Sequence, residues 1–355
     1  MYREKQLHPS NQYFSRGGKV RKRLGVVVML VLVLLLIMSA VSSAQTLDRV
    51  RERGRLICGA NNALLGFGYV DSDGNWSGFD VDFCRAIAAA VLGDANAVEF
   101  VALSAAARQP ALQTGEVDVL IRNTTATLIR ETDWTANFVP TTFYDGQGFM
   151  TRKEYGIETL EDLAGATICV TKGTTTELNL ADVLRARGIP FTPIVQEDAN
   201  TVYDSYEQGR CDAVTSDKSQ LAGMRALFAN PDDHVILEPT ISKEPLGPAV
   251  RHGDDQWFDI VSWVVNAVFY AEEVGITSEN IDTYTTDNPE IQRFLGLQGD
   301  LGEKLGLDNQ WVYRIIKQVG NYGEIWDRNL AQLGIPRGLN AQWTDGGLIY
   351  ARPFR

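Results

Sequence analysis

The segment GEVDVLIRN, residues 115–123, has a close counterpart further along the chain in GRCDAVTSD, residues 209–217. Each copy follows a stretch of helical composition and begins with a glycine suited to ending that helix. Each then continues into an apolar strand that starts at the aspartate and ends in polar residues. Two copies of one helix-to-strand unit indicate a chain built from two similar halves.

Predicted strands and helices alternate in both halves. The first half has expected strands at 56–59, 98–103 and 117–122, with helices at 79–92 and 106–114. The second has expected strands at 167–171, 191–195 and 212–216, with helices at 175–187 and 200–208. Repeated βαβ units imply parallel sheets covered by helices, and two such sheets imply two lobes. The sequence therefore predicts an α/β fold of two lobes, each a parallel-rich sheet flanked by helices.

Polar side chains stand where the third strand of the first half should end. Asn123, Thr124 and Thr125 follow the apolar residues directly, and Arg130 comes shortly afterwards. In open parallel sheets, ligands bind outside the carboxyl ends of the strands. An arginine grips a carboxylate with two parallel hydrogen bonds. The first half therefore offers a site for a carboxylate.

The second half places complementary groups at the same edge. Thr174 and Glu177 fit a capping box around a predicted helix start, beside Thr175 and Thr176. The free N–H groups of a helix start favour an anion. Asp217, at the end of the third strand, can accept hydrogen bonds from an ammonium group. A carboxylate and an ammonium together describe an α-amino acid, which is the predicted ligand.

Each of these features also has a purely structural interpretation. Threonine and asparagine are ordinary caps at strand ends. Arg130 can pair with Glu131 or Asp133 at the surface, and Asp217 can cap its own helix. The occurrence of such groups in both halves favours a binding site.

The first 44 residues differ in composition from the rest. Seven basic residues and one acidic residue precede an apolar run at 24–38, and small residues follow up to Ala44. This order is typical of a secretory signal peptide, with predicted cleavage after Ala44. An uncleaved membrane anchor is the alternative, because residues 24–41 are only slightly short of a bilayer span. No cysteine lies near the junction, so a lipid-anchored N-terminal cysteine is not expected.

The charge balance bears on possible partners. The whole chain has 33 Lys and Arg against 45 Asp and Glu, and residues 1–44 hold seven of the former and one of the latter. The remainder therefore carries a formal net charge of −18. A chain this acidic is not expected to bind nucleic acid through a basic patch.

Four cysteines in an exported chain favour disulfides over free thiols, and three connectivities are possible. In a 2-1-3 strand order the first and third strands are neighbours, so Cys169 and Cys211 can approach each other. Cys58 lies on the first strand and Cys84 on the helix over it, so we predict this pair as well. The cysteines form no C-x-x-C pair and the chain has three histidines, so no zinc site is expected. Four free thiols would fit better if residues 1–44 were not a signal peptide.

Long stretches of the chain resemble the periplasmic solute-binding proteins of polar amino-acid ABC transporters, and most closely the general L-amino-acid-binding group. The resemblance extends from about residue 47 to the end. It rests on collinear segments such as GFDVDFCRAIAAAV, GEVDVLIRNTT, FYDGQGFM, GTTTELNL, GRCDAVTSDKSQL and GLNAQWTDGGLIYARP. It implies the type II periplasmic-binding-protein fold. One lobe would comprise residues 45–147 and 247–355 with a C-terminal extension, and the other residues 148–246.

The resemblance also implies a function. An exported protein, expected to be a monomer without cofactor or metal, would capture an L-amino acid between two closing lobes and deliver it to membrane permease subunits. The family's carboxylate-binding arginine falls on Arg130, and its ammonium-binding acid on Asp217. Positions that hydrogen-bond the ligand backbone fall on Asn123, Thr125, Thr175 and Thr176.

Departures from the family pattern concern the surroundings of the ligand side chain. Ala126 stands where the group usually has Trp, and Leu64 where related binders often place a stacking aromatic residue. The segment ALSAAARQPAL, residues 102–112, lacks the charged and aromatic residues expected there. We therefore expect smaller, more apolar surroundings and a preference that differs from that of a broad-range relative.

Two other functions fit the same fold. An enzyme such as a dehydratase or a peptidoglycan-cleaving protein needs a carboxyl acid or base in the cleft. Glu177 and Asp217 are the only candidates, since neither His234 nor His252 lies at a strand end. A membrane-anchored amino-acid sensor domain would need residues 24–41 as an intact anchor.

Overall fold

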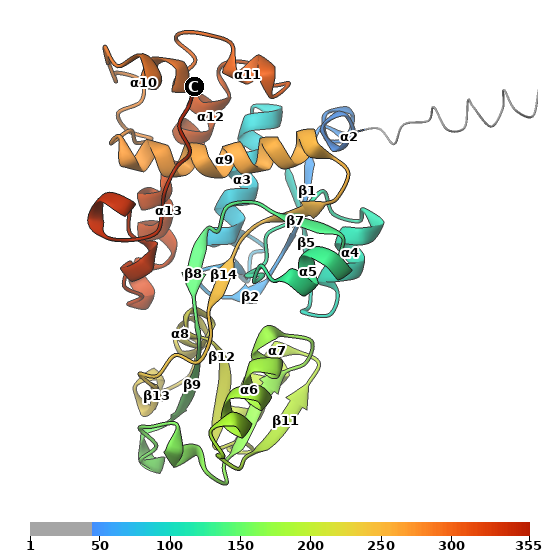
Figure 1. The fold of residues 1–355 in the computed structure, drawn as a ribbon, viewed down its shortest axis with the longest axis vertical. Coiled ribbons are helices and arrows are strands. Elements are labelled where there is room, and N and C mark those ends of the chain that lie inside the picture. Colours follow the sequence, from blue (N-terminus) through green and yellow to red (C-terminus); the bar gives the residue numbers. More distant parts are fainter. Residues whose placement is uncertain (1–44) are drawn as a thin grey trace, which may run out of the picture. The chain divides into compact units, whose positions relative to one another are not determined.

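The computed structural model describes residues 45–355, which contain two five-stranded sheets (Figure 1). The strand orders are β5-β1-β6-β15-β7 and β11-β10-β12-β9-β13. β1 pairs in parallel with β5 and β6, and β10 pairs in parallel with β11 and β12. The other two strands of each sheet join through antiparallel pairs of β15 with β6 and of β9 with β12. The predicted α/β fold with a 2-1-3 strand order in each lobe is confirmed.

The sheets are built from short strands. Those of the first sheet are β1 (Leu56–Ala60), β5 (Val98–Ala102), β6 (Val119–Leu120), β7 (Ala136–Phe138) and β15 (Ala249–Arg251). Those of the second are β9 (Gln147–Arg152), β10 (Thr167–Thr171), β11 (Thr192–Gln196), β12 (Ala213–Asp217) and β13 (His234–Ile236). A small antiparallel sheet contains β2 (Ala63–Leu64), β3 (Gly68–Val70) and β4 (Trp76–Ser77).

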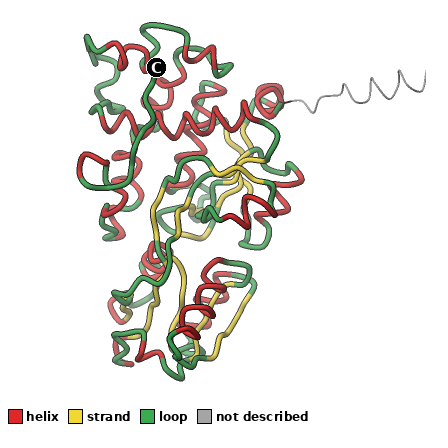
Figure 2. Tube along the Cα trace, viewed as in Figure 1, coloured by secondary structure: helices red, strands yellow, loops and turns green. Residues whose placement is uncertain are grey.

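Helices cover the sheets (Figure 2). Those preceding the return to the first sheet are α2 (Thr46–Arg53), α3 (Phe79–Leu92), α4 (Arg108–Thr114), α5 (Leu128–Asp133), α6 (Thr175–Ala186), α7 (Ala199–Glu207) and α8 (Lys218–Arg225). Those after it are α9 (Asp255–Glu273), α10 (Pro289–Phe294), α11 (Leu301–Lys304), α12 (Trp311–Gln318) and α13 (Tyr322–Asn329). Among residues 45–355, none of these helices is both long and apolar enough to cross a membrane.

Helix α3 has the predicted bounds because glycines fix both of its ends. Gly78 precedes it with φ 136°, and a Cβ there would come within 2.1 Å of the Phe67 carbonyl oxygen. Gly93 ends it in the left-handed conformation that glycine readily adopts. Between them the buried alanines let α3 pack closely against α9 and α12. The C-terminal extension, for which the sequence suggested no role, thereby joins the core of the first lobe.

Both predicted disulfides are formed. Cys58 on β1 is bonded to Cys84 on α3, and Cys169 on β10 is bonded to Cys211 just before β12. The Cα atoms are 6.2 and 5.7 Å apart, within the usual range for a disulfide. Each lobe therefore carries one covalent link between its first strand and a neighbouring segment.

Two extended segments connect the lobes. β8 (Phe143–Asp145) leads toward β9, and β14 (Glu244–Leu246) leads back toward β15. They pair antiparallel, with Tyr144 opposite Pro245. The predicted signal peptide at 1–44 and the alternative anchor at 24–41 lie outside the described residues.

Candidate functional site

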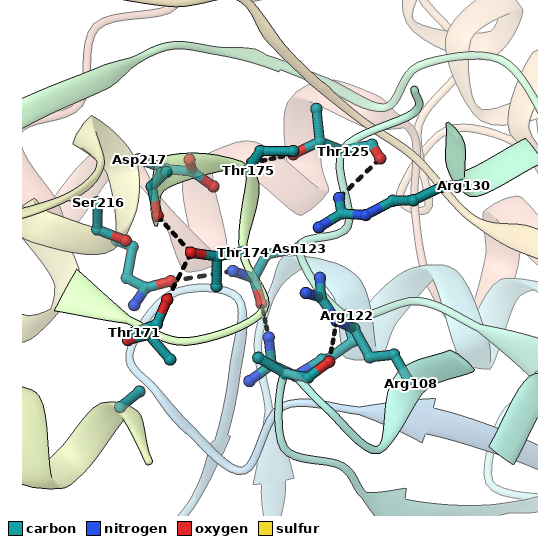
Figure 3. A pocket seen from close by; sticks show the side chains of 14 residues that line it. Arg108, Arg122, Asn123, Thr125, Arg130, Thr171, Thr174, Thr175, Ser216 and Asp217 are labelled. Carbon is teal, nitrogen blue, oxygen red and sulfur yellow. Dashed lines mark hydrogen bonds between the residues drawn. The ribbon is translucent and has the colours of Figure 1, made fainter. Parts of the chain in front are cut away.

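The carboxyl ends of β6 and β12 face one cavity between the two sheets (Figure 3). It contains about 390 Å³ not filled by protein atoms, including space open to solvent. All six residues predicted as ligand-binding line it, namely Asn123, Thr125, Arg130, Thr175, Thr176 and Asp217. The prediction that two strand ends in different halves face one site therefore agrees with the geometry.

Arg130 is held at the cavity by its own helix and by an aromatic ring. Thr127 caps α5 by accepting a hydrogen bond from the Arg130 N–H at 3.2 Å. The Arg130 Nη1 donates to the Thr125 carbonyl oxygen at 2.8 Å, and the guanidinium lies 5.0 Å from the centre of the Trp134 ring. Arg130 forms no ion pair with its neighbours in sequence, Glu131 and Asp133. The surface pairing considered from the sequence is therefore not made, and the charge is directed at the cavity.

Asp217 is the acidic counterpart in the second lobe. It precedes α8, but its side chain makes no capping bond, and one carboxylate oxygen, Oδ1, is buried without a hydrogen-bond partner among residues 45–355. Burial raises the pKa of Asp217 well above its usual range, and the nearby Asp145 and Glu244 raise it further, against a lowering by Arg130. A buried acceptor without a donor is costly. The site therefore lacks a donor at this point, and an ammonium group would supply one.

The start of α6 is capped, but not by the full predicted capping box. Thr174 Oγ1 accepts from the Glu177 N–H at 3.1 Å, as expected. The Glu177 carboxylate accepts instead from the Gly173 N–H at 2.7 Å, one residue before the cap. Thr174 also donates to the Thr171 carbonyl oxygen. Glu177 is therefore held outside the cavity lining, while Thr175 and Thr176 line the cavity.

Glu244 joins the two walls from the connecting strand β14. Its Oε2 accepts from the hydroxyl groups of Thr125 at 2.6 Å and Thr175 at 2.8 Å. Its Oε1 accepts from Asn179 and Ser242. The carboxylate is 1% exposed, so these four donors replace water around a buried charge. Glu244 is not among the residues predicted from the sequence, because a glutamate in a predicted connection carries no signal of a buried network.

Asn123 provides a second direct link between the lobes. Its amide donates to Gln220 Oε1 of α8 at 3.1 Å, while its oxygen accepts from Asn61. Its φ is 30°, a region that asparagine tolerates better than most residues, and its backbone N–H donates to Asp80 at 2.6 Å. β6 comprises two residues, Val119 and Leu120, where the sequence predicted six.

Two further arginines line the cavity and were missed. Arg108 and Arg122 are 2% and 7% exposed. Arg108 begins α4, inside the segment expected to lack charged residues at the ligand, so the expectation of smaller and more apolar surroundings is wrong at this position. The error has a simple cause. The alanine-rich composition of the segment predicts apolar surroundings, but Arg108 stands at the start of α4, and its side chain extends to Thr124 after β6.

The three guanidinium groups shape the electrostatics of the first-lobe wall. Burial lowers the pKa of Arg122 to about 10, against a raising effect of Asp80. Burial likewise raises the pKa of Asp80 to about 7. Burial lowers the pKa of Arg108 well below its usual range, as do the positive charges of Arg130 and Arg122. This wall therefore concentrates positive charge in a place poorly accessible to water.

A second cavity adjoins the first. It contains about 630 Å³ not filled by protein atoms, including space open to solvent, and it shares four lining residues with the first cavity. These are Ala105, Arg122, Ala199 and Gln220. Leu64, which stands where an aromatic residue was expected, lines this second cavity. Space for a ligand side chain thus continues beyond the six predicted residues.

The two-lobed fold and its polar interlobe cavity define a ligand-binding protein of the periplasmic-binding-protein class. Residues 56–276 match the family described as bacterial extracellular solute-binding proteins, family 3, and the chain belongs to this family. The resemblance stated from the sequence is confirmed at the level of the family.

Individual relatives cover most of the chain. It is 52% identical over 323 residues to the general L-amino acid-binding periplasmic protein AapJ of Rhizobium johnstonii, which covers 89% of this chain and 95% of the relative. It is 50% identical to the glutamate/glutamine/aspartate/asparagine-binding protein BztA of Rhodobacter capsulatus, over 90% of this chain and 96% of the relative.

A solved structure supports the fold. A periplasmic binding protein from Brucella ovis with glutathione bound matches with a TM-score of 0.86 at 52% sequence identity. The match covers 88% of this chain and all of that chain. The predicted fold class is thereby confirmed.

Proposed function

We propose that this chain is the substrate-binding component of an amino-acid ABC transporter, and that it binds an L-α-amino acid in the cavity between its lobes. The observation that carries the proposal is that a guanidinium group and a carboxyl group from different lobes line one cavity. Arg130 comes from one lobe, and Asp217, whose buried Oδ1 has no hydrogen-bond partner among residues 45–355, comes from the other. A zwitterionic head group satisfies both.

The remaining predicted residues complete the head-group site. Arg130 would bind the α-carboxylate and Asp217 the ammonium group. Thr175 and Thr176 stand at the positive end of α6, a helix of 12 residues, where N–H groups favour a carboxylate. Thr125 and Asn123 would line the opposite side. The names of the relatives support an amino-acid ligand, since both describe amino-acid-binding proteins.

We infer that the lobes comprise residues 45–147 with 247–355, and residues 148–246. Hinge closure around a ligand is a property of periplasmic binding proteins as a class. In this chain β8 and β14 would be the hinge segments. A ligand favours the closed form only through contacts that it makes better there, and the groups that Asp217, Thr175 and Thr176 present from the second lobe supply such contacts.

Export and delivery complete the proposal. Relatives described as extracellular or periplasmic support an exported chain, with a signal peptide at 1–44 and a mature chain starting at Gln45. We expect a monomer that docks in its liganded form on permease subunits at the membrane. A membrane-anchored sensor is the alternative, and the N-terminus of the mature protein distinguishes the two.

A binding role is favoured over an enzyme on the same fold. Of the two candidate acids, Glu177 is bonded to the Gly173 N–H and is not among the residues that line the cavity, whereas Asp217 is. Glu177 and Asp217 therefore do not form the acid–base pair that an enzyme would need in the cavity. Incubation with prephenate-like acids and cell-wall fragments, followed by product analysis, tests the alternative directly.

Calorimetric titration of the chain from Gln45 onward with a panel of L-amino acids tests the proposal. We expect binding of at least one amino acid. We further expect Arg130→Met to weaken it by about 2–5 kcal/mol, because the ligand carboxylate loses its partner in a site shielded from water. Arg187→Met is the matched control, since Arg187 is an exposed arginine on the second lobe. Near-normal affinity in Arg130→Met, or no binding of any amino acid, would overturn the proposal.

A further inference from the structure

Strand β14 returns the chain to the first lobe, and its backbone is already bonded there. The Ala126 N–H donates to the Pro245 carbonyl oxygen at 2.8 Å, and the Gly247 N–H donates to the Thr124 carbonyl oxygen at 3.2 Å. Thr124 and Ala126 belong to the segment that follows β6 in the first sheet. The backbone next to Glu244 is therefore fixed to the first lobe.

The side chain of Glu244 extends in the other direction, to the second lobe. Its Oε2 accepts from the Thr175 hydroxyl at 2.8 Å, and its Oε1 accepts from the Asn179 amide at 2.8 Å. Thr175 and Asn179 lie four residues apart on α6, so they share one face of that helix. A single carboxylate therefore holds α6 at two points, one turn apart, across the junction of the lobes.

Charge makes these bonds stronger than ordinary hydrogen bonds between side chains. A bond to an ionised carboxylate is about twice as strong as a neutral one. The first turn of a helix also favours a nearby negative charge. Glu244 is buried, and the hydroxyl groups of Thr125 and Ser242 are its other two donors. If α6 withdrew, the carboxylate would lose two of these four donors, and water would have to replace them.

The bonds of Glu244 to α6 are separate from the contacts proposed for a ligand. Neither Glu244 nor Asn179 is among the described residues that line the cavity. Thr125 and Thr175 do line it, and their hydroxyl oxygens are 3.5 Å apart (Figure 3). Glu244 can therefore stabilise the closed arrangement of the lobes from behind these two threonines, without touching the ligand.

We propose that Glu244 is a latch between the lobes, a positioning residue whose bonds to α6 form on closure and hold the lobes together in the ligand-free protein as well. The inference rests on the proposed function, because it assumes that the lobes close around a ligand. A ligand that binds the closed form has an apparent affinity proportional to the fraction of protein already closed. Since the bonds of the latch must break before the cleft opens, the latch should act mainly on ligand release.

Two substitutions separate the latch from the rest of the network. Asn179→Ala and Ser242→Ala each remove one donor to the same oxygen, Glu244 Oε1. Asn179 lies on α6 in the second lobe, whereas Ser242 is two residues from Glu244 in the chain and does not join it to another element. Ser242→Ala is therefore the matched control for Asn179→Ala.

Stopped-flow tryptophan fluorescence with L-glutamate measures both rate constants of binding. For Asn179→Ala we expect dissociation to become about three- to tenfold faster, while association stays within about twofold of the wild type. Glu244→Gln should change the rates in the same direction, because the amide removes the charge and one acceptor. Ser242→Ala should leave both rate constants within about twofold of the wild-type values, since its bond does not join the lobes.

Small-angle X-ray scattering of the ligand-free proteins provides an independent measurement. Asn179→Ala and Glu244→Gln should have a larger radius of gyration than the wild type, because fewer molecules are closed. Saturating L-glutamate should restore the wild-type value in both variants, since the ligand itself favours the closed form. Circular dichroism melts establish that each variant is folded, so that opening of the lobes is distinguished from unfolding.

The outcomes are separable. If no amino acid binds the wild-type chain, the proposed function fails, and the radius of gyration of the ligand-free proteins still tests the latch. The latch is wrong if Asn179→Ala releases L-glutamate no faster than the wild type, or if Ser242→Ala has the same effect as Asn179→Ala. Equal radii of gyration in the wild type, Asn179→Ala and Glu244→Gln would also overturn it.

Discussion

The two walls of the cavity differ in the charged groups that they present to a ligand. The first-lobe wall gathers three buried guanidinium groups, and two of them, Arg108 and Arg130, are each held by a carbonyl oxygen and by the Trp134 ring. The second-lobe wall offers hydroxyl groups, the start of α6, and the carboxyl group of Asp217, whose Oδ1 has no hydrogen-bond partner in the described part of the chain. A carboxylate-bearing ligand can be held by the first wall alone, whereas its ammonium group needs the second. This asymmetry suggests that capture begins at the first lobe and that closure follows from contacts with the second.

Of the substitutions considered, Asp217→Asn should have the largest effect, because it removes the acidic group of the second-lobe wall. The ammonium of the ligand loses its anionic partner, so we expect binding to weaken by about 2–5 kcal/mol in calorimetric titration. The ligand-free variant should nonetheless be at least as stable as the wild type, because a buried carboxylate with an unsatisfied oxygen has been neutralised. Reduced stability together with unchanged affinity would mean that Asp217 is a structural residue.

The disulfides allow the lobes to be compared as folded units. Replacing either pair by alanines should lower the free energy of unfolding by about 2–4 kcal/mol, since each bond constrains the unfolded chain. The Cys169–Cys211 link spans 42 residues and the Cys58–Cys84 link 26. The longer loop should therefore cost about 0.4 kcal/mol more, a small difference that strain can mask. Urea titration measures both losses, and a stability gain on removing either bond would contradict the expectation.

The pH dependence of binding should report on the second wall. In the ligand-free protein, burial raises the pKa of Asp217, with Asp145 and Glu244 raising it further. The ligand ammonium would lower that pKa, so between the two values the free protein holds more protons than the complex. Binding should then release protons, and affinity should rise with pH by up to about tenfold per unit. Calorimetry in buffers of different ionisation enthalpy counts the protons, and proton uptake on binding would contradict this account.

Removing a helix cap should have the smallest effect, and it compares one helix of the first-lobe wall with one of the second-lobe wall. Thr127→Ala and Thr174→Ala each remove the side-chain cap of one helix, α5 or α6, and should each cost about 1 kcal/mol of stability. Thr127→Ala should also weaken ligand binding, because its cap positions the backbone of Arg130. Thr174 also lines the cavity, but Thr174→Ala should affect binding less, since its hydroxyl bonds to Thr171, Thr176 and Glu177 and does not position the charged Arg130. Thermal melts and titrations of both variants test the ranking.

Local sequence signals predicted much of the fold. The alanine-rich periodicity of residues 79–92 predicted α3 to the residue, and the repeated strand pattern predicted the two parallel cores. β6 was overestimated at both ends, and after it the left-handed backbone of Asn123 and its bond to Asp80 are tertiary features that apolar periodicity does not report.

In the site too, local sequence patterns predicted some residues, whereas tertiary contacts placed others. The six predicted residues line the cavity because they stand at strand ends or helix starts, positions that a sequence pattern defines. Arg108 lines the cavity from a helix start, and Glu244 bonds from a connecting strand to two residues that line it, Thr125 and Thr175. Their burial depends on the assembled lobes, so no local pattern marked them as functional.

A crystal structure of the chain in complex with L-glutamate is the most direct measurement. The account predicts the α-carboxylate paired with the Arg130 guanidinium and the ammonium nitrogen within about 3 Å of Asp217 Oδ1, the distance of a hydrogen bond. A ligand whose ammonium is bound elsewhere, with Asp217 still unpartnered, would contradict it.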